Sequence, residues 1–401
     1  MNSIVDTTYD KALRAVESCI RDVGFWASGL PGGYESIWAR DSMITSLGAS
    51  TVGSESENTE SFQKIRKKFK EAFKKSIETL SEHQTELGQI PNNVGSWNEE
   101  RQSDITYNTI DSNLLYIIGH NTYVKAYNDN TLLQKYDRNI KKALLWLQYQ
   151  DPNEDKLLVQ LPTTDWQDAF PHKYGHTINT QALYYGVLKI LNKNREAEHI
   201  KQVVNGETKK YLSLYDEEKG FYLPFAWKTH GPEYREQGNW FDTLGNLLAI
   251  ITGLATPKIT NEILDYIKKE EIAKPFPCRS VHPPIKPGDE FWFDYYKASD
   301  AGEPYAYLNG GVWPYIGGFY VAALVKAGRQ EEAEKELENL AKANMLPQKK
   351  SDGTIEKHGF HEWIHGQTGK PGPNSNTYQG WSCGMYLFAY ECIKRKEVPY
   401  F

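Results

Sequence analysis

Two short segments of the chain carry groups suited to acid–base chemistry. Asp165 and Asp168 lie three residues apart, and Glu362 lies in a second segment that also contains His365. Hydrolysis of an acetal needs one carboxylic acid that protonates the leaving oxygen and one carboxylate that activates water. A carboxyl group keeps its proton when it is buried or lies beside another carboxylate, and Asp165 is such a neighbour for Asp168. These residues therefore indicate acid–base chemistry at an uncharged substrate.

Other segments are rich in indole, amide, carboxylate and guanidinium side chains. They read Trp38-Ala39-Arg40-Asp41, Gly238-Asn239-Trp240-Phe241-Asp242 and Asn309-Gly310-Gly311-Val312-Trp313-Pro314. Apolar sugar faces stack on Trp and Tyr, and forked polar groups hold pairs of hydroxyls. The sequence contains neither metal-ligand spacing nor a phosphate-binding loop. We therefore expect a neutral polyol ligand, no metal and no other cofactor.

Each of these residues also has a purely structural interpretation. Asp168 could cap a loop, and Arg40 with Asp41 could form an ion pair at the start of a helix. Glu362 could be an ordinary surface residue, with Glu356 as a competitor for its role. Three histidines are more typical of hydrogen-bonded structural positions than of acid–base groups: His176, His361 and His365.

Two kinds of helical segment alternate along the chain and would position these residues. One kind is amphipathic, and the other, as in residues 244–251 and 317–325, is apolar on nearly every side and must be buried. The predicted helices are 6–22, 41–53, 58–80, 109–127, 131–149, 177–192, 195–214, 241–254, 258–269, 311–327, 329–344 and 377–394. The buried kind recurs every 64 to 70 residues or so, which indicates a repeated helical hairpin.

Six such hairpins predict an all-α fold, an (α/α)6 toroid with inner and outer helix rings, formed by residues 1–401 as a single domain. An open helical solenoid is the alternative, but it would need polar terminal repeats. In a toroid all outer-to-inner connections emerge at one end. Asp168 precedes the third inner helix and Glu362 the sixth, so the two would face each other across one mouth.

The composition excludes several classes of partner. The net charge is -6, and acidic and basic residues are interspersed along the chain. Neither nucleic acid nor an anionic membrane is therefore an expected partner. The first residues lack the apolar region of a signal peptide, and no later run approaches the roughly 20 apolar residues of a membrane span. We expect a cytoplasmic protein whose four scattered cysteines are reduced. The sequence leaves a homo-oligomer open.

The motifs together resemble the (α/α)6 inverting glycosidases. This group includes the glucoamylases, the α-1,6-glucosidase domain of glycogen debranching enzymes, the α-glucosidase I-like enzymes and the neutral or alkaline invertases. The resemblance runs from about Tyr34 to Tyr386 and rests on motifs in the same order as in those families. The segments 309–314 and 362–369 are most similar to the invertases and the bacterial debranching-like enzymes.

The resemblance implies roles for individual residues. The last Asp of Asp165-Trp166-Gln167-Asp168 corresponds to the general acid, and Glu362 corresponds to the general base. Arg40 and Asp41 would bind hydroxyls of the first sugar beside Trp38. The full set of expected substrate-binding residues is Trp38, Arg40, Asp41, Asn93, Asp111, Asp165, Trp166, His176, Gln181, Trp240, Asp242, Trp313, His365, Tyr378 and Trp381.

The expected function is inverting hydrolysis of an α-glucosidic bond in a small oligosaccharide or glucoside. A neutral invertase-like sucrose hydrolase is the alternative within the same chemistry. A sugar epimerase or isomerase on the same toroid would instead use histidines such as His176 and His365. A glycan-binding protein without catalysis is the third class, because a fold alone does not fix a function.

Overall fold

The computed structural model describes residues 3–30, 33–53, 60–95, 104–208, 210–227, 235–349 and 353–401. Through these residues, helices of two kinds alternate, as the sequence predicts. The buried helices are α2 (Ala39–Ala49), α4 (Asp111–Tyr127), α7 (Ile178–Ile190), α9 (Thr243–Thr252), α11 (Pro314–Lys326) and α13 (Gly380–Arg395). The amphipathic helices are α1 (Ile4–Ser18), α3 (Glu60–Glu82), α5 (Thr131–Lys135), α6 (Asp137–Gln148), α8 (Asn194–Val204), α10 (Pro257–Lys269) and α12 (Gln330–Asn344).

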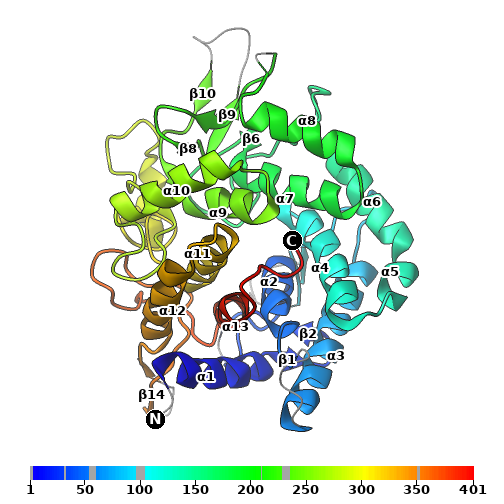
Figure 1. Cartoon of the computed structure of the whole chain (residues 1–401), viewed down its shortest axis with the longest axis vertical. Coiled ribbons are helices and arrows are strands. Elements are labelled where there is room, and N and C mark those ends of the chain that lie inside the picture. The colour runs from blue at the N-terminus through cyan, green and yellow to red at the C-terminus, as the bar shows by residue number, and fades with distance from the viewer. Residues whose placement is uncertain are drawn as a thin grey trace.

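The buried helices form a closed inner ring (Figure 1). Each one packs against the next in chain order, and α13 packs against α2 as well as against α11. Glycines allow the closing contact between α2 and α13, because a Cβ atom on Gly48 would lie 1.7 Å from the carbonyl oxygen of Gly384. The ring therefore closes rather than continuing as an open solenoid.

The amphipathic helices surround this ring, and each buries one stripe of apolar side chains. In α10 the residues Ile259, Ile263 and Ile267 are buried at helical spacing, and the last turn carries lysines. Thr256 caps this helix by accepting a hydrogen bond from the Ile259 amide at 3.3 Å, and Pro257 occupies its first turn.

Most predicted helix boundaries differ from the structure by a few residues, and three of the larger differences show why. The segment predicted as 195–214 ends at Val204, where Gly206 has a φ of 78° that a continuing helix does not allow. The segment predicted as 131–149 is divided into α5 and α6 at Tyr136. The first helix ends at Ser18, and the chain then turns back through β1 (Ile20–Arg21) and β2 (Gly24–Phe25).

Short strands lead from the outer-to-inner connections into the inner helices. β3 (Ile37–Trp38) precedes α2 and pairs with β4 (Asn93–Val94), which also pairs with β5 (Ile105–Thr106). β6 (His176–Thr177) precedes α7 and pairs with β9 (Phe225–Trp227), whose other neighbour is β10 (Glu236–Gln237). β11 (Phe241–Asp242) precedes α9 and pairs with β12 (Val281–His282). These pairings fix the helix starts at one end of the ring. The remaining hairpins are β7 (Tyr215–Asp216) with β8 (Phe221–Tyr222), and β13 (Gln348–Lys349) with β14 (Ile355–Glu356).

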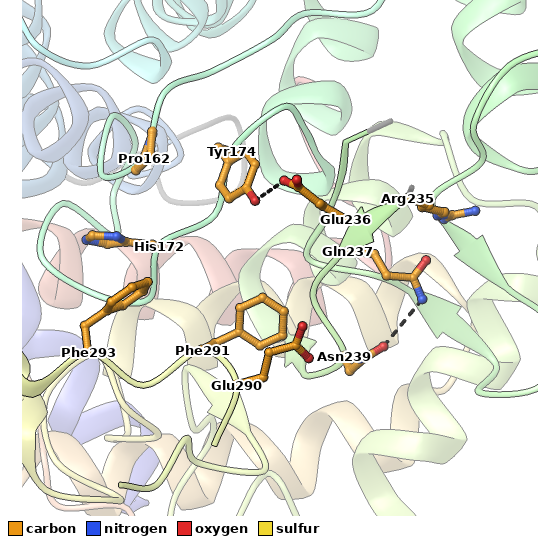
Figure 2. Close-up of a pocket in the computed structure, with 10 residues that line it drawn as sticks. All are labelled: Pro162, His172, Tyr174, Arg235, Glu236, Gln237, Asn239, Glu290, Phe291 and Phe293. Atoms are coloured by element: carbon orange, nitrogen blue, oxygen red, sulfur yellow. Dashed lines mark hydrogen bonds between the residues drawn. The ribbon is translucent and has the colours of Figure 1, made fainter. Parts of the chain in front are cut away.

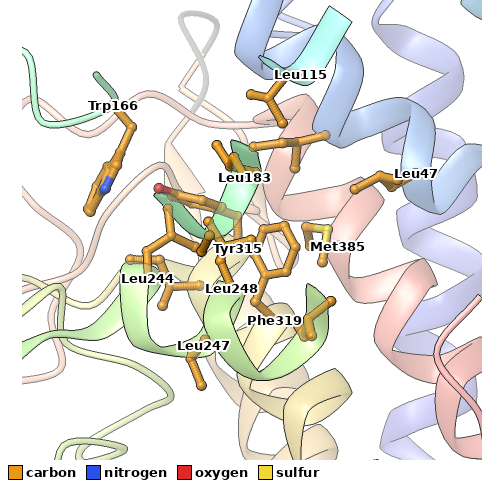
Figure 3. Close-up of a cluster of buried hydrophobic side chains, with 14 of the residues drawn as sticks. Leu47, Leu115, Trp166, Leu183, Leu244, Leu247, Leu248, Tyr315, Phe319 and Met385 are labelled. Carbon is orange, nitrogen blue, oxygen red and sulfur yellow. The ribbon is translucent and has the colours of Figure 1, made fainter. Parts of the chain in front are cut away.

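Side chains from all of the inner helices fill the axis of the ring. The cluster includes one buried apolar residue from each of them: Leu47, Leu115, Leu183, Leu248, Phe319 and Met385 (Figure 3). Trp166 and Tyr315 belong to the same cluster. These contacts join all six inner helices through one apolar cluster. No helix among the described residues is both long enough and apolar enough to cross a bilayer.

Candidate active site

The connections at one end of the ring enclose a cavity of about 290 Å3. The lining side chains come from the first, second, third, fifth and sixth connections and from the starts of α2 and α13. The lining residues are Tyr34, Trp38, Arg40, Asp41, Asn92, Asn108, Trp166, Asp168, Tyr307, Trp313, Glu362 and Trp381. Asp168 and Glu362, which lie far apart in the sequence, thus share one cavity.

Aromatic rings form a packed wall of this cavity. The Trp381 ring stacks on Tyr315 with centroids 4.3 Å apart, and the Trp166 and Trp313 rings meet edge to face at 5.5 Å. The Trp313 indole Nε1 donates a 3.0 Å hydrogen bond to the Tyr307 carbonyl oxygen. Rings held in this way offer flat, rigid surfaces for the apolar faces of a sugar.

Arg40 is the one cation among the described residues that line the cavity. It is almost fully buried in the first turn of α2, where Nη1 donates a hydrogen bond to Oδ2 of Asp111 at 2.8 Å. Its Nη2 lies 3.8 Å from Oδ2 of Asp168. Three carboxyl groups, those of Asp41, Asp168 and Glu362, line the same cavity, so full ionisation would leave an excess of negative charge there.

This charge excess favours protonated carboxyl groups. Burial raises the pKa of Asp168 to about 6, and the Asp111 and Asp165 carboxylates act in the same direction against the opposing effect of Arg40. Burial likewise raises the pKa of Asp41 to about 7. The Asp168 side chain keeps 35% of its surface exposed. Asp168 is therefore half protonated near pH 6, and its exposed surface can meet a ligand.

Glu362 is held in place by Asn376. The Glu362 amide donates to the Asn376 carbonyl oxygen at 2.8 Å, and Oε2 of Glu362 accepts hydrogen bonds from the amide and Nδ2 of Asn376, each at 3.3 Å. Burial raises the pKa of Glu362 to about 8, although the hydrogen bonds from Asn376 oppose this shift. A buried carboxylate of this kind is a strong proton acceptor when it is ionised.

A buried ion triad supports the segment that carries Asp168. Nζ of Lys173 lies 2.9 Å from Oδ2 of Asp165 and 2.7 Å from Oδ2 of Asp242, and all three side chains are inaccessible to solvent. Asp242 also caps α9 by accepting a hydrogen bond from the Gly245 amide at 3.2 Å. The triad therefore ties the Asp165–Asp168 segment to the start of α9. Lys173, its central residue, was not among the predicted site residues.

The predicted site residues separate into two groups. Asp168, Glu362 and six predicted substrate-binding residues line the cavity: Trp38, Arg40, Asp41, Trp166, Trp313 and Trp381. The others lie outside its lining: Asn93, Asp111, Asp165, His176, Gln181, Trp240, Asp242, His365 and Tyr378.

The second group makes contacts that support the surrounding backbone. His176 Nδ1 lies 3.2 Å from the Leu158 carbonyl oxygen, and Gln181 donates to the same oxygen at 2.7 Å. His365 Nδ1 accepts hydrogen bonds from two backbone amides at 3.2 Å. The Trp240 ring packs against Phe291, with centroids 5.0 Å apart.

Asn93 and Tyr378 have similar structural contacts. Asn93 accepts a hydrogen bond from the Thr106 hydroxyl across the β4–β5 pair, and its Nδ2 donates to the Gly95 carbonyl oxygen at 3.1 Å. The Tyr378 amide donates to the Gly359 carbonyl oxygen at 2.8 Å, and its ring packs edge to face against Phe360.

Four lining residues were missed by sequence reasoning: Tyr34, Asn92, Asn108 and Tyr307. Asn92 directly precedes Asn93, and successive side chains of an extended chain point in opposite directions. The prediction was therefore wrong by one residue: the side-chain amide of Asn92, and not that of Asn93, lines the cavity. Tyr34 and Tyr307 lie in irregular connections, where no periodic pattern shows the direction of a side chain.

Known proteins resemble this chain in part of its sequence. Residues 210–396 match the model of a family described as alkaline and neutral invertase. Probable alkaline/neutral invertase D of Arabidopsis thaliana is 32% identical over 153 residues, which are 37% of this chain and 26% of that protein. Cytosolic invertase 1 of Oryza sativa subsp. japonica is 31% identical over 153 residues, 37% of this chain and 25% of that protein. The chain thus aligns with about a quarter of the length of these relatives.

Solved structures share the fold over nearly the whole chain. The GH63 mannosylglycerate hydrolase from Thermus thermophilus superposes with a TM-score of 0.66 at 12% identity and covers 95% of this chain and 99% of its own. A bacterial glucoamylase bound to acarbose superposes with a TM-score of 0.60 at 13% identity and covers 98% of this chain and 56% of its own. These likenesses confirm the predicted (α/α)6 toroid.

Proposed function

We propose that the chain is an inverting glycoside hydrolase that cleaves an α-glucosidic bond, with Asp168 as general acid and Glu362 as general base. One observation carries this proposal: two carboxyl groups from the third and sixth connections line a single aromatic cavity. The resemblance to the alkaline and neutral invertases over residues 210–396, which include Glu362, supports it. The catalytic unit we propose is the whole chain, because the ring needs both α2 and α13 to close.

The reaction follows from the two carboxyl groups. Asp168 donates its proton to the glycosidic oxygen while the bond from that oxygen to the anomeric carbon breaks. Glu362 accepts a proton from a water molecule, whose oxygen forms the new bond on the opposite face of the sugar. One water molecule is consumed for each glycosidic bond broken: its hydroxyl group goes to the anomeric carbon, and the leaving group takes up a proton. The anomeric configuration inverts because water attacks from the face opposite the leaving group. Asp168 ends ionised and Glu362 protonated, and proton exchange with solvent regenerates the reactive form in which Asp168 is protonated and Glu362 ionised.

The cavity suggests a small substrate unit in the first subsite. Its volume of about 290 Å3 lies just below the range for ligand sites, which is about 300 to 1,000 Å3. The Arg40 guanidinium and the Asp41 carboxyl group can hold neighbouring hydroxyls, while the Trp rings contact the apolar face. Among the disaccharides, sucrose is the one favoured by the resemblance to the invertases.

The geometry does not favour an isomerase. The histidines that such an enzyme would use, His176 and His365, lie outside the cavity lining and hydrogen bond to the backbone. The cytoplasmic location expected from the sequence stays a prediction, because the names of the relatives include cytosolic, chloroplastic and mitochondrial proteins.

A sugar panel with an NMR readout tests the proposal. Sucrose, maltose, isomaltose and trehalose are incubated with the wild type and with Asp168→Asn, and proton NMR records the anomer that is released first. We expect the β anomer of glucose from at least one α-glucoside, and a fall in kcat of about 10^2 to 10^4 in the variant. Release of the α anomer would contradict inversion, and unchanged turnover in Asp168→Asn would contradict the role of that residue.

A further inference from the structure

A second cavity, of about 510 Å3, is lined in part by the connection that carries Asp168. One segment of the chain lines both cavities, because Trp166 and Asp168 face the first while His172 and Tyr174 line the second. Asp168 and His172 are four residues apart, so their Cα atoms are separated by no more than about 14 Å. The second cavity is therefore within the reach of a ligand that extends from Asp168.

One side of the second cavity is aromatic. It is formed by His172, Tyr174, Phe291 and Phe293 (Figure 2). The His172 and Phe293 rings lie 5.1 Å apart, and Phe291 packs against Trp240. Phe293 leaves 42% of its surface exposed. A large apolar side chain that is both exposed and part of a concave wall is typical of a binding site.

The other side of the second cavity is polar. It is formed by Arg235, Glu236, Gln237, Asn239 and Glu290. The Glu236 carboxylate accepts a hydrogen bond from the Tyr174 hydroxyl, and Nε2 of Gln237 donates a 3.5 Å hydrogen bond to Oδ1 of Asn239. Carboxylate and amide groups opposite aromatic rings match a saccharide, which has apolar faces and paired hydroxyls.

We propose that this second cavity binds the leaving-group end of the substrate, so that the preferred substrate is an α-glucoside larger than a disaccharide. This inference rests on the proposed function, in which Asp168 protonates the leaving oxygen. A general acid lies on the leaving-group side of the scissile bond. The segment that carries Asp168 continues directly into the second cavity, which is larger than the first. The first cavity would hold the glucosyl unit, and the second the distal sugar of the leaving group.

Matched pairs of sugars test this assignment. Maltotriose and 1-kestose extend the leaving groups of maltose and sucrose by one sugar, whereas raffinose extends sucrose at its glucosyl end. We expect kcat/KM to be about tenfold higher for the extended leaving groups and lower for raffinose. Phe293→Ala lowers kcat/KM for maltotriose and 1-kestose about five- to tenfold and changes the disaccharides by less than about twofold. Tyr149→Ala, at a 78% exposed aromatic residue outside both cavities, is the matched control and changes neither.

Two results would overturn the assignment: equal kcat/KM for short and extended leaving groups, or equal losses for both in Phe293→Ala. If no sugar in the panel is hydrolysed, the proposed function fails. Calorimetric titration with maltotriose then tests separately whether the second cavity binds a saccharide. Binding that weakens about fivefold or more in Phe293→Ala and is unchanged in Tyr149→Ala supports a saccharide site there. Absent binding, or equal binding by the wild type and Phe293→Ala, overturns it.

Discussion

Nη1 of Arg40 donates a 2.8 Å hydrogen bond to Oδ2 of Asp111, and both side chains are almost completely buried. Asp111 begins α4 and Arg40 lies in the first turn of α2, so this pair joins neighbouring helices of the inner ring directly below the cavity. The same guanidinium is close to Asp168. The Arg40 side chain thus both joins two helices of the inner ring and places a positive charge near Asp168.

Removal of Arg40 tests that connection. In Arg40→Met the Asp111 carboxylate loses its partner in a buried position, and we expect the free energy of unfolding to fall by about 3 to 5 kcal/mol. Denaturant titration measures this change. Lys141→Met is the control, because its pair with Asp137 is exposed and contributes less than about 1 kcal/mol. A loss in Arg40→Met no larger than in the control would show that Asp111 is not stabilised by Arg40.

The roles of Asp168 and Glu362 can be separated with α-glucosyl fluoride. Fluoride leaves without protonation, so Asp168→Asn needs no acid for this substrate, whereas Glu362→Gln still lacks its base. We expect Asp168→Asn to hydrolyse the fluoride within about tenfold of the wild-type rate. On natural glucosides we expect its kcat to fall by a factor of about 10^2 to 10^4. Glu362→Gln loses activity on both. If only Glu362→Gln hydrolysed the fluoride, Glu362 would be the general acid and Asp168 the general base.

The rate should depend on pH in a bell-shaped manner. Burial raises the pKa of Asp168 to about 6 and that of Glu362 to about 8, and the two groups influence each other. Below about pH 6 both carry a proton and no base is present, and above about pH 8 both are ionised and no acid is present. The singly protonated pair is most abundant near pH 7. Because Glu362 has the higher pKa, the proton lies mainly on Glu362, and the productive form with a protonated Asp168 is the minor part of this pair. Initial rates of kcat/KM between pH 4 and 10 measure this profile, and a maximum below pH 5 would contradict it.

Lys173 is expected to act through Asp168 without contacting the substrate. Although burial alone would lower the pKa of Lys173, the Asp165 and Asp242 carboxylates hold it above its usual value. Lys173→Met leaves two buried carboxylates unpaired, and we expect a loss of about 3 to 5 kcal/mol in the free energy of unfolding.

A second variant keeps this prediction informative if Lys173→Met does not fold. Lys173→Arg keeps the charge in a larger group and should restore part of the stability while lowering kcat more than it raises KM, because the Asp168 segment is displaced. Lys297→Met, at an exposed ion pair with Asp294, serves as the control. Equal stability of Lys173→Met and the wild type would contradict the proposed role of the triad.

The fold could be predicted because the inner and outer helices differ in a property that the sequence displays. All residues of α2 are buried, and α10 buries a single stripe, so apolar periodicity distinguishes the two kinds. The start of α10 was equally visible in Thr256 and Pro257. The division between α5 and α6 at Tyr136 could not be predicted, because the residues on both sides of it favour helix.

The site could be predicted only as far as motifs reach. Trp38, Arg40 and Asp168 lie in motifs, and each one lines the cavity. Tyr307 and Lys173 belong to irregular connections, where tertiary contacts decide which way a side chain points. Tyr307 has a φ of 43°, a left-handed conformation that residue preferences do not anticipate for tyrosine.

The contact of Gly48 with Gly384 also bears on how the molecule unfolds. In a linear array of repeats the terminal units have one neighbour each, so fraying starts there and moves inward. Here α2 and α13 are neighbours, and every inner helix is flanked on both sides. No repeat is therefore a weak end, and loss of one helix removes support from two others. The ring consequently has the architecture of a single cooperative unit, in which separation of α2 from α13 is the step that converts it into an array able to melt piece by piece.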